Sequence, residues 1–408
     1  MEKSLDGTKE NFWLNRKVII VIHEATTGPG HDLRDYLLQR KVEELLFISH
    51  PLLYLPENFK NSSRYELYKR GEFVKSKNAF HWILPEPFLY VKEFLYTFFW
   101  SITLIKKGGF FFGLGNLNAF TGWFLKFFRT IDTVIYYPVD YVPKRFHSKV
   151  LNLIYHHIEK FCAQHSDWTW NFSPRVIEAR SKRWGMTFKN QLIVPHGVHF
   201  NRIKRLPFEK IHKTEVLYMG TLFKKQGVQL VVEALPEVIK KFPEIKFVVI
   251  GKGPYELELK KLVKKLKVAK YVEFLGYIPS HAVMENRIAQ AAVAVALYDK
   301  KYDDFSYYGT PGKIKNYLGA GVPIIMTDVP YGVKQVEDAQ CGFIIKYSKD
   351  ELADKLVNFF SNEKIMKSYR INALKFAKKY DWDRVFAKAL TPVCSQIIKQ
   401  SILVKQSD

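Results

Sequence analysis

The sequence has few cysteines, no long uninterrupted apolar run and far fewer acidic than basic residues. Its three cysteines, Cys162, Cys341 and Cys394, are far apart and form no CxxC pair, which argues against a disulfide framework and a structural zinc site. The N-terminal segment MEKSLDGTKENFW is polar and lacks the apolar stretch of a signal peptide. These features predict a protein of a reducing, cytoplasmic compartment.

The charge balance is strongly basic. Lys and Arg number 63 against 40 Asp and Glu, so the formal net charge of the 408 residues is +23 at pH 7. Such a surface favours an anionic partner, which could be nucleic acid, an acidic membrane face or a phosphorylated substrate. The lysine-rich stretch 260–270 has no interleaved aromatics and belongs to no nucleic-acid motif, so nucleic acid is the least favoured of the three.

One apolar stretch, residues 88–105, approaches the length of a membrane span but contains Lys92 and Glu93. Two interpretations remain. The stretch could be an interfacial helix with Tyr96 and Trp100 near lipid headgroups, or a helix buried in a domain core. Burial is favoured over membrane contact, and a true span is not expected.

Short apolar runs alternate with helical patterns along the whole chain, which is typical of parallel sheets covered on both faces. We therefore predict an α/β protein with two tandem doubly wound, Rossmann-like domains that face a cleft, with ligands at the carboxyl ends of the strands. The linker is expected near residues 196–214. The expected strands are 17–23, 44–49, 133–139, 167–173 and 191–195 in the first domain, and 215–220, 246–251, 271–276, 292–298, 322–327 and 342–346 in the second.

A glycine-rich turn follows the first expected strand. Gly28 and Gly30 permit unusual backbone conformations, and a helix is predicted to begin near His31 or Asp32. Such a turn can bring backbone N–H groups close to a ligand, or it can simply be a tight turn, and the sequence favours neither alternative. The turn lacks the third glycine of the GxGxxG dinucleotide fingerprint.

Two more turns of this form occur in the second half of the chain. Gly220 precedes Lys224 and Lys225, and Gly251 and Gly253 follow the next expected strand. Lysines beside the N-terminus of a helix make a phosphate site. The turns together therefore indicate a phosphorylated ligand.

The segment YYGTPGKIKNYLGAGVPII is the strongest candidate of the set. Thr310 is a good N-cap residue, and Pro311 suits the first position of a helix. Gly312 and Lys313 would then present bare N–H groups and a positive charge to an anion. Asn316 follows Lys313 by one turn, so both side chains could face the same ligand.

These segments resemble the nucleotide-sugar-binding domain of the retaining GT-B glycosyltransferases of family 4, over about residues 215–385. The motifs that carry the resemblance are VLYMGTLFKKQGVQLVVEAL, VVIGKGPYELELKKL, PGKIKNYLGAGVPIIMTD and YDWDRVFAKAL. The resemblance implies an acceptor-binding domain at 1–197, a nucleotide-sugar-binding domain at 198–380 and a C-terminal helix, 381–408, that returns to the first domain.

The resemblance implies an enzyme that moves a sugar from a nucleotide-diphosphate sugar to a glycan or a lipid-linked glycan, with retention, in polysaccharide or glycolipid biosynthesis. The nucleotide sugar is a substrate, and neither a cofactor nor a metal ion is expected. Lys313 and Asp140 are the implied catalytic residues, with Val139 in the place of the family's histidine. The implied donor-binding residues are Gly220, Lys224, Lys225, Gly251, Gly253, Asp304, Thr310, Gly312, Lys313 and Asn316, and the acceptor-binding residues are Gly28, Gly30, His31, Tyr141 and Arg145.

Several family positions differ in this chain. The two family glutamates fall on Tyr308 and Asn316, and the family's diphosphate-binding Arg and Lys fall on Thr221 and Gln226. These differences keep open a second hypothesis, a noncatalytic sugar-nucleotide-binding or scaffold protein on the same fold. The basic charge and the aromatic stretch also suggest a peripheral location at the inner face of a membrane.

Overall fold

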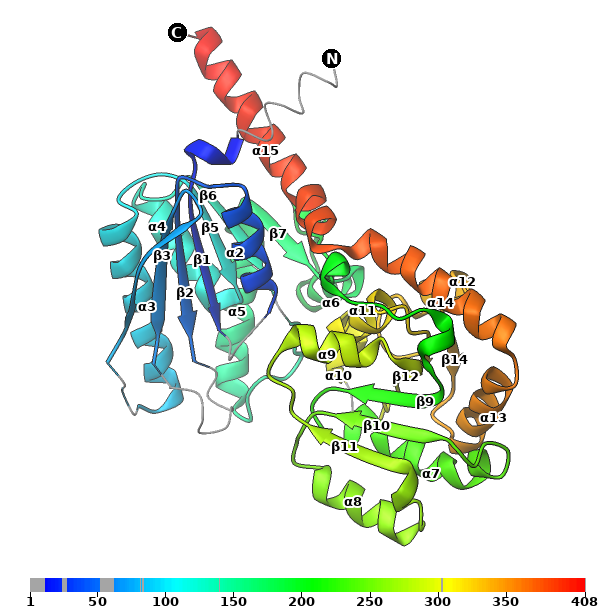
Figure 1. The fold of residues 1–408 in the computed structure, drawn as a ribbon. Coiled ribbons are helices and arrows are strands. Elements are labelled where there is room, and N and C mark those ends of the chain that lie inside the picture. The colour runs from blue at the N-terminus through cyan, green and yellow to red at the C-terminus, as the bar shows by residue number, and fades with distance from the viewer. Residues whose placement is uncertain are drawn as a thin grey trace. The chain divides into compact units, whose positions relative to one another are not determined.

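A computed structural model describes the chain in two compact units (Figure 1). Unit 1 comprises residues 1–194 and 385–408, and unit 2 comprises residues 195–384. Each unit is built around one sheet. The residues that the structure describes are 12–23, 28–51, 62–80, 82, 84–138, 140–301 and 304–407.

The sheet of unit 1 has eight strands in the order β4-β3-β2-β1-β5-β6-β7-β8. Six neighbouring strands run parallel, in the order β2-β1-β5-β6-β7-β8. Strands β3 and β4 form an antiparallel hairpin that pairs with β2 at one edge of the sheet. The strand order reverses between β1 and β5, which makes this the topological switch point. The strands are β1 (Lys17–His23), β2 (Glu44–His50), β3 (Arg64–Lys69), β4 (Glu72–Asn78), β5 (Phe110–Leu114), β6 (Thr133–Tyr137), β7 (Trp168–Asn171) and β8 (Gln191–Ile193).

All five strands predicted for this unit are present, but three others were missed. The run FFFGL of β5 is short, contains a glycine and follows directly after two more glycines, so its pattern reads as a loop. Every residue of β4 is exposed, and β3 is a short strand with charged residues at both ends, so neither has the continuous apolar run that marks the predicted strands.

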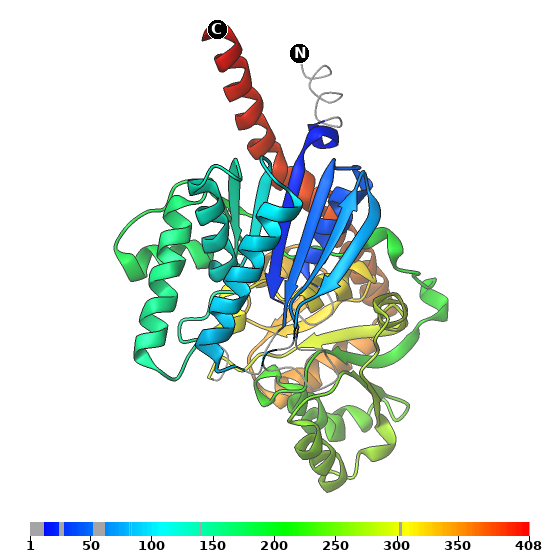
Figure 2. The same ribbon diagram turned by 90° about the vertical axis from the view of Figure 1, so that its left-hand side faces the viewer.

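Helices cover both faces of the unit 1 sheet. Figures 1 and 2 show α3 and α4 on one face and α2 with the unit 1 part of α15 on the other. The rings of Tyr36 in α2 and Phe386 in α15 are 5.4 Å apart, so the C-terminal helix packs against unit 1. The helices of this unit are α2 (Pro29–Gln39), α3 (Glu86–Leu104), α4 (Asn116–Phe127), α5 (Lys149–His165), α6 (Pro174–Trp184) and α15 (Trp382–Ser407).

Helix α3 carries its polar and apolar residues on unexpected faces. The sequence favoured burial of this stretch, and that prediction is wrong for one side of the helix, whose large side chains are exposed by 45% to 62%: Phe88, Val91, Leu95 and Phe99. The buried side carries four polar residues, Lys92, Glu93, Thr97 and Ser101, beside the apolar Leu89, while Phe98 and Trp100 pack partly buried against the core. No helix in the described ranges is both long and apolar enough to cross a membrane.

The sheet of unit 2 has six parallel strands in the order β11-β10-β9-β12-β13-β14. This is the strand order of a doubly wound dinucleotide-binding sheet, with the switch point between β9 and β12. The strands are β9 (His212–Met219), β10 (Lys246–Ile250), β11 (Val272–Gly276), β12 (Ala291–Ala296), β13 (Ile324–Thr327) and β14 (Gly342–Ile345), so all six predicted strands are present.

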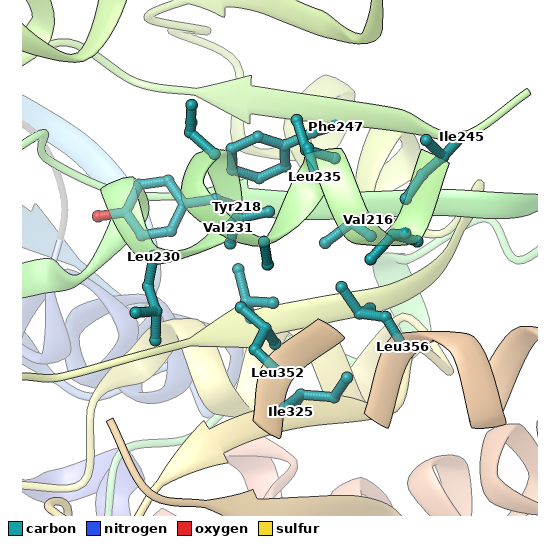
Figure 3. Packing of buried hydrophobic residues seen from close by; sticks show 14 of the residues in the cluster. Val216, Tyr218, Leu230, Val231, Leu235, Ile245, Phe247, Ile325, Leu352 and Leu356 are labelled. Carbon is teal, nitrogen blue, oxygen red and sulfur yellow. The ribbon is translucent and has the colours of Figure 1, made fainter. Parts of the chain in front are cut away.

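Side chains of β9 alternate between two cores. Val216 and Tyr218 enter a cluster with residues of α7 and α13 (Figure 3), whereas Leu217 joins a second cluster on the opposite face, beside α11. Burial of one such large apolar side chain contributes about 1.5–3 kcal/mol. The helices are α7 (Val228–Ile239), α8 (Glu256–Lys265), α9 (His281–Ile288), α10 (Asp304–Tyr308), α11 (Gly312–Gly319), α12 (Val333–Asp338), α13 (Lys349–Phe360) and α14 (Glu363–Ala377).

Candidate functional site

The start of α11 lies one residue later than the sequence predicted. Pro311, not Thr310, occupies the N-cap position, so the expected capping role of Thr310 is wrong. The hydroxyl of Thr310 instead accepts a hydrogen bond from the backbone N–H of His196, at 3.4 Å. Gly312 and Lys313 are the first helical residues, and backbone N–H groups at that position have no partner within the helix.

The ammonium of Lys313 lies at the switch point of unit 2. It donates a hydrogen bond to Oε1 of Gln226 at 2.6 Å, and it lies 4.6 Å and 5.3 Å from the ring centroids of Tyr218 and Tyr298. Tyr218 is in β9 and Tyr298 follows β12, the two strands that flank the switch point. A Cβ placed on Gly220 would be 3.0 Å from this ammonium, so Gly220 and Lys313 share one site.

Asn316 lies one turn further along α11. Its side chain is partly exposed and hydrogen-bonds no residue in the described part of the chain. The position of the helix is fixed by the next residue, Tyr317, whose buried hydroxyl accepts a hydrogen bond from the N–H of Met219 at 2.7 Å. The end of β9 therefore holds α11 in place, with Lys313 and Asn316 on it.

The glycines after β9 and β10 have a packing role. A Cβ on Gly251 would lie 2.1 Å from the carbonyl oxygen of Gly220, and a Cβ on Gly253 would lie 2.4 Å from that of Leu222. The two turns thus pack backbone against backbone, and this contact alone requires glycine. Between the turn of Gly220 and α7, Lys224 and Lys225 lie in a short 3₁₀ helix, where Lys224 is exposed.

His196 is a site neighbour that the sequence did not single out. Its ring lies 5.2 Å from that of Trp382, and a Cβ on Gly312 would be 2.7 Å from its Cε1 atom. Gly312 therefore allows the imidazole to lie directly against the start of α11. The signal in the sequence was the segment IVPHGVHF, residues 193–200, which resembles a segment of the same family in which an asparagine stands in the place of His196.

Lys315 is on another side of α11, away from Lys313. Burial lowers the pKa of its ammonium to about 7, and the ammonium lies 3.4 Å and 5.0 Å from the ring centroids of Tyr380 and Phe376. The residue lines a small pocket beside the start of the helix. The pocket is formed by Thr310, Pro311, Ile314, Lys315, Met326, Tyr331, Gly332 and Val336.

In unit 1, the glycine turn leads into α2, which begins at Pro29 and thus before the predicted start near His31. A Cβ on Gly30 would lie 2.4 Å from Cγ2 of Ile22, so this glycine is needed for the close packing of α2 on β1. The His31 ring packs 4.8 Å from the ring of Phe47 in β2. Gly28 directly precedes the helix.

The other predicted acceptor residues follow β6. Tyr141 is buried, and its hydroxyl accepts a hydrogen bond from Nε of Arg183 at 3.3 Å. Arg145 is exposed, with its guanidinium 5.8 Å from the ring centroid of Tyr155, and Asp140 is exposed. Strands β1 and β6 both pair with β5, so the turns after them lie along the same carboxyl edge of the sheet.

Two predicted positions cannot be placed in full. Val139, the residue in the place of the family histidine, lies outside the described residues. Asp304 begins α10, but its side chain also lies outside them. Among the residues that are described, no three His, Cys, Asp or Glu side chains group together as a metal site would require.

The sequence missed a polar cluster at the switch point of unit 1. Nε2 of His23 lies 2.8 Å from Oε2 of Glu93, and Nδ1 of the same ring lies 3.0 Å from the amide nitrogen of Asn118. His23 ends β1, Glu93 is in α3, and Asn118 is in the first turn of α4. The available signal was Glu93 within an apolar stretch, which served only to argue against a membrane span.

Comparison with proteins of known structure identifies the fold. Sucrose-phosphate synthase from Thermosynechococcus elongatus superposes with a TM-score of 0.69 at 14% identity, over 96% of this chain and 100% of that one. The two Rossmann-like units of this chain thus make the GT-B fold. Residues 202–376, which lie within unit 2, match the model of the family glycosyl transferases group 1.

Two curated relatives match part of this chain. The GtfA subunit of the UDP-N-acetylglucosamine–peptide N-acetylglucosaminyltransferase of Streptococcus pneumoniae is 26% identical over 162 residues, which are 40% of this chain and 30% of the relative. The phosphatidyl-myo-inositol mannosyltransferase of Mycobacterium leprae is 22% identical over 223 residues, which are 53% of this chain and 57% of the relative. The chain thus covers between about a third and just over half of the length of these relatives.

Proposed function

We propose that the protein transfers a sugar from a nucleotide-diphosphate sugar to a hydroxyl of a glycan or lipid-linked glycan, with retention of configuration. The observation that supports this most is the position of the Lys313 ammonium beside Gly220, at the switch point of unit 2. Ligands of doubly wound sheets bind at that point, and a diphosphate there would meet a positive charge and the start of a helix.

The donor site is proposed to consist of the first turn of α11 and the turns that face it. Lys313 and the N–H groups at Gly312 would bind the diphosphate, while Asn316 would hydrogen-bond a ribose hydroxyl. The resembling family has a lysine at the position of Gln226, and in the proposed site Lys313 supplies this positive charge instead. The hydrogen bond to Gln226 keeps the Lys313 ammonium at that position. Gly220, Gly251 and Gly253 keep the neighbouring turns close, and Lys224 and Lys225 add positive charge. Asp304 is included in the proposed site as a ligand of the sugar hydroxyls.

In the proposed reaction, the bond between the sugar C1 and the leaving diphosphate oxygen breaks. The acceptor hydroxyl oxygen forms its new bond to C1 on the same face, and its proton passes to the leaving diphosphate. Lys313 stabilises the negative charge that develops on that diphosphate, so it acts in the transition state. The acceptor would bind in unit 1, at the carboxyl edge that carries Gly28, His31, Asp140, Tyr141 and Arg145.

The exposed face of α3 supports a peripheral location on an anionic membrane. Its four large exposed side chains repeat at helical spacing, and Phe127 and Phe128 at the end of α4 are exposed by 66% and 60%. Exposed basic residues lie beside this face. Lys106 and Lys107 are in the turn that follows α3, and Arg129 is in the turn that follows α4. The two turns are joined by a hydrogen bond from the N–H of Gly108 to the carbonyl of Thr130, at 2.8 Å. Apolar side chains edged by exposed cations fit an anionic lipid surface.

A thermal-shift panel of UDP, GDP, ADP and their sugars tests the donor proposal. A nucleotide present at about a hundred times its dissociation constant adds about 2.7 kcal/mol to the free energy of unfolding. We expect at least one member of the panel to raise the melting temperature of the full chain. If none does, the protein is not a nucleotide-sugar transferase, and a scaffold on the same fold becomes the better account.

A further inference from the structure

Polar side chains surround the switch point of unit 1, where the order of strands reverses between β1 and β5. His23 is the last residue of β1, Asn118 lies just beyond β5, and Glu93 projects from the inner face of α3. Glu93 is only 4% exposed, and a buried carboxylate is costly unless it is paired or used. In sheets of this kind the ligand crevice lies at the switch point.

Asn118 determines where the proton of the His23 ring resides. Its amide nitrogen donates to the carbonyl of Leu114 at 2.8 Å and lies 3.0 Å from Nδ1 of His23. An amide nitrogen only donates, so Nδ1 accepts and the proton is on Nε2, which donates to Oε2 of Glu93 at 2.8 Å. The imidazole is therefore neutral, and it orients the carboxylate.

The cluster is not fully paired. Oε1 of Glu93 hydrogen-bonds no described residue, and the buried ammonium of Lys92, next to it in the sequence, also has no hydrogen-bond partner among the described residues. Burial lowers the pKa of Lys92, which interacts electrostatically with Glu93 and with His50. A polar cluster that served only to stabilise the fold would be satisfied within itself.

His50 is a further ionisable residue near the Glu93 carboxylate and the Lys92 ammonium. Its ring lies 5.3 Å from that of His23, and its nitrogens are 2.9 Å from the hydroxyl of Ser63 and 2.8 Å from that of Thr97. Burial holds the pKa of His50 well below its usual value, so this ring is neutral too. The charges of the cluster are then one negative, on Glu93, and one positive, on Lys92.

We propose that Glu93 and Lys92 bind hydroxyl groups of the acceptor, and that His23 is the positioning residue that holds the Glu93 carboxylate. This inference rests on the proposed transferase function and names the part of unit 1 that recognises the acceptor. The cluster has no net charge, and it offers one acceptor and one donor. It therefore suits a neutral polyhydroxylated ligand, a sugar or a polyol, better than a phosphate.

Histidine side chains labelled with ¹⁵N test the site without a transfer assay. The full chain is titrated with methyl glycosides of glucose, mannose and N-acetylglucosamine at tens of millimolar, and His23 is assigned through His23→Gln. We expect at least one glycoside to shift the His23 ring resonances. Those of His156, a buried histidine of the same unit paired with Glu159 at 3.0 Å, should stay in place. Glu93→Gln should weaken the glycoside by about tenfold or more.

Two further variants and one further ligand make the outcome decisive. Lys92→Met should lose the glycoside shift as Glu93→Gln does, which keeps the test open if one of the two fails to fold. Ser101→Ala, on the same inner face of α3, should respond like the unmodified protein. No shift of His23 with any of the three glycosides, or an unchanged shift in Glu93→Gln, would overturn the proposal. The thermal shift with UDP distinguishes this proposal from the proposed function. Stabilisation by UDP without a glycoside-induced shift of His23 would contradict the acceptor site but not the donor site. A shift of His23 without stabilisation by any nucleotide would support a sugar site but not a transferase.

Discussion

The ammonium of Lys313 lies 2.6 Å from Oε1 of Gln226, so the positive charge of a lysine on α11 lies beside the turn that follows β9. The resembling glycosyltransferases carry a lysine at the position of Gln226 itself. In this chain the positive charge reaches the same place from a different element. This contact is compatible with diphosphate binding, although the chain has a glutamine where the resembling family has a lysine.

Removal of that charge should weaken the donor site. Hydrogen bonds to charged groups contribute about 1.5–3 kcal/mol, so Lys313→Ala should raise the dissociation constant of the nucleoside diphosphate that binds by about 10- to 100-fold. Isothermal titration measures this directly. Lys264→Ala, which removes an exposed lysine from α8, is the matched control and should bind as before. Equal affinities of Lys313→Ala and the control would rule out Lys313 as a phosphate ligand.

Asn316 should act on the nucleoside and not on the phosphates. Asn316→Ala should weaken a nucleoside diphosphate by about 2- to 10-fold, the effect of one neutral hydrogen bond, and leave inorganic pyrophosphate unaffected. Asn316→Glu restores the family residue and should tighten the nucleoside diphosphate. Competition between pyrophosphate and the nucleotide in the same titration separates the two parts. A parallel loss of both ligands would contradict a ribose contact.

Gly220 should be intolerant of a side chain for two reasons. Its φ of 145° is unfavourable for other residues, and a Cβ there would lie 3.0 Å from the Lys313 ammonium. Gly220→Ala should cost about 1–2 kcal/mol of stability and also reduce nucleotide affinity. Gly276→Ala provides the control, since its φ of 68° is also positive but its nearest neighbour is Cε of Lys252, at 3.5 Å. The control should lose stability and keep its affinity.

Lys315 should make stability depend on pH. Burial lowers its pKa from 10.5 to about 7, so between these values the unfolded chain binds the proton more tightly than the folded one. The contribution of Lys315 to the free energy of unfolding therefore rises with pH across this window, and its destabilising effect is greatest below about pH 7. Cys341 and Tyr380 have raised pKa values and stay neutral over most of the window. Lys315→Met should raise the melting temperature by several degrees near pH 6 and by much less near pH 10, and an equal gain at both would show that the lysine is not buried in its charged form.

The apolar face of α3 should govern binding to anionic vesicles. The double variant Leu95→Gln and Phe99→Gln changes side chains that are 45% and 54% exposed, so the melting temperature should change little. Cosedimentation with vesicles that contain phosphatidylglycerol should fall severalfold. Leu257→Gln changes a leucine of unit 2 that is 63% exposed, and this variant should bind as before. Unchanged cosedimentation of the double variant would remove α3 as the contact surface.

The sequence predicted the strands that the hydrophobic pattern marks, and it failed where the pattern is absent. Runs such as KVIIVIH are continuously apolar because both of their faces are buried, and β1 matches this run residue for residue. Strand β5 was missed because its short run is bounded by glycines, and α3 was misjudged because its polar side faces inward.

The candidate sites were predictable to the extent that they follow one continuous segment. Lys313 and Asn316 lie on one helix, so their spacing was visible in the sequence. The contact between Lys313 and Gln226, and the cluster of His23, Glu93 and Asn118, join residues that are 70 or more positions apart. Only the order of the strands in each sheet brings such residues together, and a single sequence does not reveal that order.

The central claim is that the protein is a sugar transferase whose donor diphosphate binds at Lys313. The most direct measurement is the release of nucleoside diphosphate from the stabilising nucleotide sugar, followed with and without an added glycan acceptor, in the unmodified chain and in Lys313→Ala. We expect acceptor-dependent release that falls at least about tenfold in the variant. Nucleotide-sugar binding with no release in either protein, under conditions where the acceptor also binds, would contradict the account.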